Sequence, residues 1–188
     1  MPRIPLVPAA RADRLTRWVY RVCARKYGAV LEPLAVLAHH RKLMLASGVA
    51  ELAVEKAATV LPAAVRELAV YRVATALGCS WCVDFGTMLQ RNEGLDLDRL
   101  AEIDDYRNSA AFSELDRLVI EYADAMTALP MRVTDEQVAE LERRLGRAGA
   151  VELTHLIALE NQRTRFNHAL GITAQGFTSG EACRAPMP

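Results

Sequence analysis

The sequence predicts an all-α fold, a compact array of about seven helices. Apolar residues recur at helical spacing through most of the 188 residues. Prolines, glycines and capping residues separate these stretches, at positions where helices begin and end. No stretch alternates apolar and polar residues as a half-buried strand does, and no hairpin dipeptide joins two such stretches.

Length and composition predict one main domain. With 52% hydrophobic residues, the chain is long enough for one substantial core. We divide it into an extended N-terminal arm (1–10), a single helical domain (11–172) and a C-terminal tail (173–188). The arm is expected because the prolines at positions 2, 5 and 8 exclude a regular helix.

Charge and targeting signals narrow the class of protein. Lys plus Arg and Asp plus Glu both number 23, so no basic surface for nucleic acid is expected, and a small or apolar substrate fits best. The proline-rich start does not resemble a signal peptide. No apolar run approaches the roughly 18 to 20 residues of a membrane span. We therefore expect a cytoplasmic protein with no membrane segment.

Four helices are expected in the first half of the chain. Gly28 ends the first, Ser47-Gly48 ends the second, and Pro62 lies in the first turn of the fourth, where proline is tolerated. The apolar spacing places these helices at 12–27, 33–46, 49–60 and 62–77.

Five more helical segments are expected after Gly78. Ser113 is a capping residue, and Thr134 and Gln137 form a capping box. Gly146 separates the last two helices. The expected ranges are 79–90, 97–103, 114–128, 134–145 and 148–170.

A Cys-x-x-Cys pair, Cys79 and Cys82, follows Gly78 at the start of the fifth expected helix. The free amides and positive dipole end of that turn favour a thiolate there. Glu67 lies on the preceding, mostly apolar helix, where a carboxylate is costly unless it has a partner or a chemical task. A zinc site would need two more ligands, and the adjacent His39 and His40 diverge on a helix. A dithiol redox site is therefore favoured over a metal site.

The stretch from Leu61 to Cys82 resembles the core motif of the carboxymuconolactone decarboxylase superfamily, in its alkylhydroperoxidase D-like branch. The spacing from Glu67 to Cys79 is the one that this branch shows. The stretch from Leu37 to Leu43 is similar to the family's preceding helix, and Arg165 to Ile172 to its closing helix. The resemblance covers about residues 30 to 172 and implies an alkylhydroperoxidase D-like helical array.

The resemblance also implies a mechanism. Cys82, the deeper cysteine, attacks a hydroperoxide, and the more exposed Cys79 resolves the sulfenic acid. Glu67 moves protons, and a lipoyl or thioredoxin-like dithiol reduces the resulting disulfide. The family implies a homo-oligomer, and no cofactor is expected. The sequence departs from the branch at the proton relay, which usually contains two histidines. Trp81 and Gly86 occupy the positions of these histidines, and Asp84 or Tyr71 are weak replacements.

Two other functions fit the same residues. One is a lactone or small-acid reaction closer to the decarboxylases of the superfamily, which typically lack the cysteine pair. The other is a non-catalytic helical oligomer whose cysteines respond to redox state. Glu67 has a structural alternative too, as an ion-pair partner of Arg72 or of another arginine.

Overall fold

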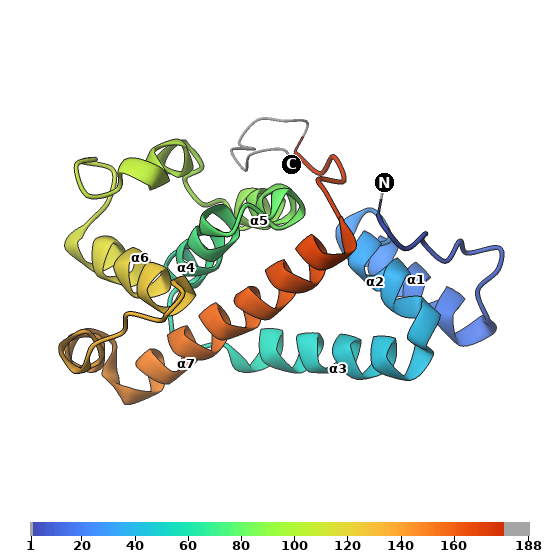
Figure 1. The fold of residues 1–188 in the computed structure, drawn as a ribbon, viewed down its shortest axis with the longest axis horizontal. Coiled ribbons are helices and arrows are strands. Elements are labelled where there is room, and N and C mark those ends of the chain that lie inside the picture. Colours follow the sequence, from blue (N-terminus) through green and yellow to red (C-terminus); the bar gives the residue numbers. More distant parts are fainter. Residues whose placement is uncertain (1, 179–188) are drawn as a thin grey trace. The chain divides into compact units, whose positions relative to one another are not determined.

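The computed structural model describes residues 2–178, and these residues contain seven α-helices, two 3-10 helices and no strand. The all-α prediction is therefore confirmed (Figure 1). None of the described helices is both long and apolar enough to cross a bilayer. The helices are α1 (Arg14–Tyr27), α2 (Glu32–Leu37), η1 (Ala38–His40), α3 (Arg41–Ala57), α4 (Ala63–Ala76), α5 (Ser80–Asn92), η2 (Asp98–Asp105), α6 (Glu114–Thr127) and α7 (Asp135–Leu170).

The described residues fall into two compact units. The first contains residues 2–58 with 169–172, and the second contains 59–168 with 173–178. The division into an arm (1–10), one domain (11–172) and a tail (173–188) stays a prediction. Cys183 lies outside the described residues.

In the first unit, α1 ends at Gly28 as its sequence predicts and begins at Arg14, two residues after the predicted start. The Asp13 carboxylate accepts hydrogen bonds from the backbone N–H groups of Leu15 and Thr16, and Gly28 closes the helix at φ 80°. Cys23 is buried and unpaired on this helix. Residues 2–10 form no helix; the backbone N–H of Val7 donates to Ala35 O (3.1 Å).

The boundary predicted at Ser47-Gly48 is wrong, because α3 runs through both residues. The break falls earlier, in η1, and His40 caps α3 through a hydrogen bond from the Leu43 backbone N–H to its ring. A glycine inside a helix costs only about 1 kcal/mol. Without a capping partner after it, Gly48 does not end the helix.

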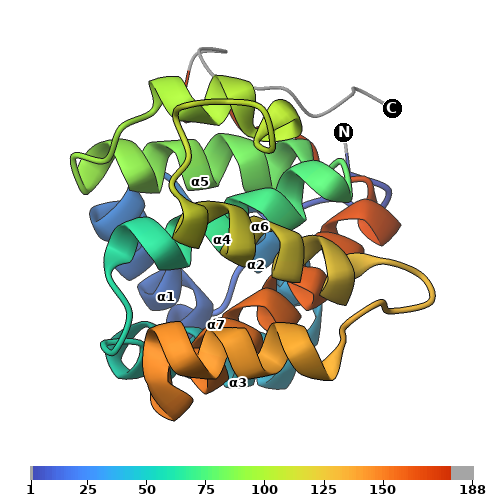
Figure 2. The same ribbon diagram turned by 90° about the vertical axis from the view of Figure 1, so that its left-hand side faces the viewer.

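The core of the second unit lies among α4, α6 and α7. The buried side chains Val73, Val119, Leu141 and Ile157 belong to one cluster drawn from these helices. Helix α4 packs against both α5 and α6 (Figure 2). Because α4 has neighbours on two sides, it is apolar over most of its circumference.

Local capping chemistry sets the later boundaries. Ser113 and Asp116 form a reciprocal capping box at the start of α6. Thr134 and Gln137 form the predicted box before α7. The predicted break at Gly146 is present as a kink within α7, where this residue has φ 71° and ψ 167°.

Candidate functional site

The two cysteines form a disulfide at the start of α5. Gly78, at φ 69°, turns the chain after α4, and Cys79 is the N-cap of α5. Cys79 and Cys82 are bonded to each other, with 5.3 Å between their Cα atoms. The backbone N–H of Cys82 donates to Sγ of Cys79 (3.2 Å), so the helix start directs a donor at this sulfur.

One face of α7 supplies polar groups to both sulfurs. Oγ1 of Thr164 lies 3.5 Å from Sγ of Cys82. Nδ2 of Asn167 donates to Sγ of Cys82 (3.4 Å) and to Sγ of Cys79 (3.7 Å). Oγ1 of Thr164 also donates to Oε1 of Glu160 (3.3 Å), one turn earlier in α7. All three α7 side chains are buried.

The sequence reasoning missed Glu160, Thr164 and Asn167. Their spacing of four and three places them on one face of a helix. The buried residues Ile157 and Leu153 occupy the same face one and two turns before Glu160. A polar triplet that continues an apolar stripe was the available signal, because buried polar groups need partners.

Glu67 lies on α4 and is half-buried. Desolvation and repulsion from Glu93 raise its pKa to about 7, against the lowering effect of Arg66 and Arg163. Repulsion from Glu160 adds to the increase. Within residues 2–178 no hydrogen bond joins Glu67 to either sulfur, whose side-chain partners are Thr164 and Asn167. The alternative ion pair with Arg72 is wrong, because Arg72 binds Asp104 (2.9 Å) and Asp124 (2.5 Å).

Asp84 is committed to the backbone that follows α7. Its Oδ2 accepts hydrogen bonds from the N–H groups of Gln175 (2.9 Å), Gly176 (2.7 Å) and Phe177 (3.0 Å). Its Oδ1 accepts from the N–H (2.9 Å) and the hydroxyl (2.7 Å) of Thr178. Desolvation opposes the charge, but these hydrogen bonds outweigh it and lower the pKa of Asp84. Asp84 therefore holds residues 175–178 and does not replace a relay histidine.

An aromatic cluster covers the same part of α5. Trp81 stacks on Phe85 with ring centroids 4.8 Å apart, and Phe177 meets both rings edge-on. Nε1 of Trp81 donates to Oε1 of Gln175 (3.1 Å). Trp81 is thus a packing residue. A Cβ atom at Gly86 would lie 3.7 Å from the Tyr71 ring, so this helix position faces α4.

The exposure of the cysteines differs from the order that the resemblance implies. Cys79 is 4% exposed and Cys82 is 7% exposed, so neither is the accessible partner in this oxidised form. Tertiary contacts bury both cysteines. Asn167 contacts both sulfurs, and residues 174–178 bond to Ser80, Trp81 and Asp84 on the first turns of α5.

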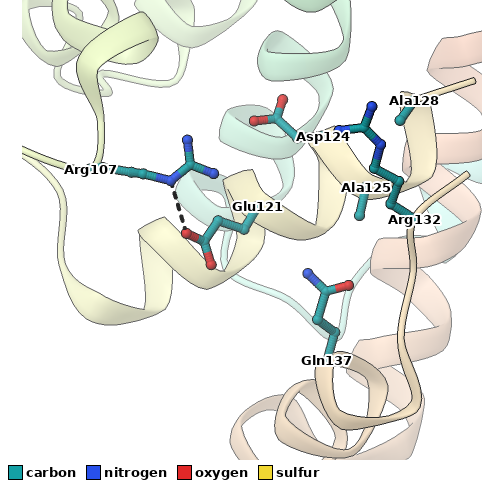
Figure 3. A pocket seen from close by; sticks show the side chains of 7 residues that line it. All are labelled: Arg107, Glu121, Asp124, Ala125, Ala128, Arg132 and Gln137. Carbon is teal, nitrogen blue, oxygen red and sulfur yellow. Dashed lines mark hydrogen bonds and ion pairs between the residues drawn. The ribbon is translucent and has the colours of Figure 1, made fainter.

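A pocket lies at α6 (Figure 3), and neither Cys79 nor Cys82 lines it. It has a volume of about 360 Å³. Its acidic residues already have partners: Glu121 binds Arg107, and Asp124 binds Arg72. The pocket contains none of the predicted site residues. Its lining residues are Arg107, Glu121, Asp124, Ala125, Ala128, Arg132 and Gln137.

Among residues 2–178, no three His, Cys, Asp or Glu side chains gather as a metal site requires.

Comparisons with known proteins identify the family of the chain and agree with its fold. The family model described as carboxymuconolactone decarboxylase family matches residues 44–125. The uncharacterized protein YnjA of Escherichia coli (strain K12) is 32% identical over 186 residues, covering 99% of this chain and 95% of that protein.

Two solved structures share the fold at 18% identity. The apo debrominase Bmp8 superimposes with a TM-score of 0.75, covering 87% of this chain and 88% of that chain. The C82A form of Bmp8 in complex with 2,3,4-tribromopyrrole gives 0.77, with 89% of each chain covered. On the sequence match to the family model and to YnjA, the chain belongs to the carboxymuconolactone decarboxylase family.

Proposed function

We propose that this protein is a dithiol peroxidase that reduces hydroperoxides through Cys79 and Cys82. The observation that carries the proposal is the Cys79–Cys82 disulfide, held at a helix start among the Thr164 hydroxyl and the Asn167 amide. Donors beside a sulfur favour its thiolate, which is the nucleophilic form. A dithiol that closes into a disulfide in place can lose two electrons in one cycle.

The cycle begins with the reduced pair. The Cys82 thiolate attacks one oxygen of the hydroperoxide, forming an S–O bond as the O–O bond breaks, and the leaving alkoxide takes a proton to become an alcohol. Cys79 then attacks the Cys82 sulfenic acid. The S–S bond forms, the S–O bond breaks, and hydroxide leaves as water with the proton of the Cys79 thiol. The peroxide gains the two electrons that the dithiol loses.

Glu67 is the group that we assign to proton transfer. With a pKa of about 7, it is present in both protonation states near neutral pH. A group in this condition both donates and recovers a proton efficiently. An external dithiol must then reduce the disulfide, and we propose a lipoyl or thioredoxin-like donor. Assembly as a homo-oligomer in the cytoplasm stays a prediction.

The test is peroxide consumption by the full chain with a dithiol donor such as dihydrolipoamide. Cys82→Ser and Cys79→Ser are each expected to lose at least about 100-fold in steady-state rate, since each cysteine takes part in a bond-forming step. Cys23→Ala, on α1, serves as the matched control and retains the rate. Full peroxide turnover in Cys82→Ser contradicts the proposal.

A second candidate is reductive removal of halogen from a small aromatic ring. It is favoured by the aromatic cluster of Trp81, Phe85 and Phe177 on the turns that hold the cysteines, and by the fold shared with the debrominase Bmp8. The dithiol would supply two electrons, so that a carbon–bromine bond becomes carbon–hydrogen with release of bromide and formation of the disulfide. Bromide release from 2,3,4-tribromopyrrole, without peroxide turnover, selects this candidate.

The two remaining alternatives separate in the same assays. A lactone or small-acid enzyme keeps its turnover in the double variant Cys79→Ser, Cys82→Ser. A redox-responsive oligomer changes its assembly on oxidation and consumes neither peroxide nor bromopyrrole.

A further inference from the structure

The buried polar side chains of α7 are placed to carry out the proton transfer at Cys82 that the absent histidines would otherwise perform. Trp81 packs with Phe85, Gly86 has no side chain, and Asp84 is saturated by residues 175–178. None of these three residues therefore accepts a proton from Cys82. Thr164 is the hydroxyl group at the Cys82 sulfur, and it also contacts Glu160.

We propose that Thr164 relays the proton of the Cys82 thiol to Glu160, and that Asn167 holds the resulting thiolate. This inference rests on the dithiol chemistry proposed above. In the reduced protein the Cys82 S–H donates to the Thr164 oxygen while the Thr164 O–H donates to Glu160. A concerted shift along these two bonds breaks S–H, forms a new O–H on Thr164, and transfers the original Thr164 proton to the carboxylate. The products are a Cys82 thiolate and a neutral Glu160.

The distances fit such a relay. The sulfur–oxygen distance is 3.5 Å and the oxygen–oxygen distance is 3.3 Å, so both links are within hydrogen-bonding reach before reduction shifts the sulfurs. Thr164 is 1% exposed and Glu160 is 4% exposed, so bulk water does not compete for the proton. A buried residue with one hydroxyl, which both donates and accepts, is the minimum that a relay needs.

Glu160 is a buried carboxylate that is paired with Arg163. Nη1 of Arg163 lies 3.2 Å from Oε2 of Glu160 and favours the carboxylate form, which is present before the proton is transferred. Burial and the nearby Glu67 favour the neutral form once the proton has arrived. Glu67 in turn interacts electrostatically with Arg66 and Glu93. On the sulfur side, Asn167 adds an uncharged amide that contacts both cysteines.

Asn167 has a different task. Its amide donates to both sulfurs and contributes no titrating group. It can therefore stabilise a thiolate on Cys82 during attack and on Cys79 during reduction of the disulfide. Of the two cysteines, Thr164 contacts only Cys82, so substitution of Thr164 should change the reactivity of Cys82 and not that of Cys79.

The experiment measures the thiols directly and needs no peroxide. Reduced full-length protein is alkylated with iodoacetamide at a series of pH values, and peptide mass spectrometry separates Cys82 from Cys79, Cys23 and Cys183. Thr164→Val removes the hydroxyl at nearly constant volume, and Thr164→Ser retains it as the matched control. Glu160→Gln removes the acceptor at the end of the relay.

Thr164→Val is expected to raise the alkylation midpoint of Cys82 by about one pH unit, which slows its reaction about tenfold near neutral pH. Glu160→Gln removes the proton acceptor together with a negative charge, so alkylation of Cys82 at pH values below its midpoint should fall while the midpoint itself does not rise. Thr164→Ser should stay within about twofold of wild type, and Cys79 should be unchanged in Thr164→Val. If circular dichroism shows that Thr164→Val is folded and its Cys82 midpoint is unchanged, the relay is overturned.

The outcomes separate the relay from the proposed function. A shifted Cys82 midpoint supports the relay even if the wild-type protein consumes no peroxide, in which case the peroxidase proposal alone fails. An equal shift in Thr164→Ser shows that local packing controls the thiol, and this also overturns the relay.

Discussion

Two carboxylates on the neighbouring helices α5 and α4, Asp84 and Glu67, have opposite environments. Asp84 is 2% exposed and accepts five hydrogen bonds, four from backbone N–H groups and one from a hydroxyl. Glu67 is half-buried, and desolvation dominates its surroundings. The pKa of Asp84 is lowered and that of Glu67 is raised to about 7. Burial alone thus does not identify a proton-transfer group, because satisfied hydrogen bonds reverse its effect.

The difference also separates structure from chemistry. A carboxylate with a lowered pKa stays charged at neutral pH and holds its donors, which suits Asp84 to fixing residues 175–178 against α5. A carboxylate with a pKa near neutrality exchanges protons. Glu67 is therefore the better candidate for catalysis, although Asp84 is closer to Cys82 in the sequence.

The largest effect is expected from Asp84→Ala. It leaves four backbone donors and the Thr178 hydroxyl without their acceptor, and should lower the free energy of unfolding by about 3 kcal/mol in urea titrations near pH 7. Hydrogen exchange of the amides of residues 175–178 should accelerate as well. Asp98→Ala, at an exposed aspartate, is the control and should stay within about 0.5 kcal/mol. Equal stability of Asp84→Ala and wild type would remove the structural role of Asp84.

Glu67→Gln should have a smaller and pH-dependent effect. The pKa of Glu67 in the folded protein, about 7, exceeds its ordinary value of 4.5. The contribution of Glu67 to stability is therefore fully present below pH 4.5 and is lost as the pH rises through about 7. Relative to wild type, Glu67→Gln should therefore be more stable by roughly 2 kcal/mol near pH 8 and nearly equal near pH 5.

Activity should change in the opposite direction for the same variant. Peroxide turnover near neutral pH should fall at least about tenfold, since a glutamine side chain does not exchange a proton. Urea unfolding at the two pH values, combined with the dithiol-coupled assay, checks both parts. A variant that loses stability at both pH values would show that Glu67 makes a structural ion pair.

The smallest effect is expected from Gly86→Ala. The added Cβ atom would meet the Tyr71 ring at 3.7 Å, an ordinary contact, and alanine is favoured over glycine within a helix. Thermal unfolding should show a gain of about 0.5 to 1 kcal/mol with turnover unchanged. A loss of turnover in this variant would show that the space beside Gly86 takes part in the chemistry between Glu67 and Cys82.

Several features of the molecule were determined by the sequence alone. The Asp13 cap, the two capping boxes and the chain reversals at Gly28 and Gly78 follow from residues within a few positions of one another. The placement of Cys79 and Cys82 at a helix start is local in the same sense. Where a local signal was weak, as at Ser47-Gly48, the helix continued because nothing nearby ended it.

The tertiary structure decided the composition of the site. Cys82 and Thr164 are 82 positions apart, and Asp84 and Thr178 are 94 positions apart. Such contacts depend on how α5, α7 and the segment after α7 pack, which no local pattern encodes. The sequence determined that the two cysteines lie at the start of a helix, and the packing of α7 determined which side chains contact their sulfurs. The reason is physical: capping and turn formation act within a few residues, whereas burial pairs polar groups across the whole chain.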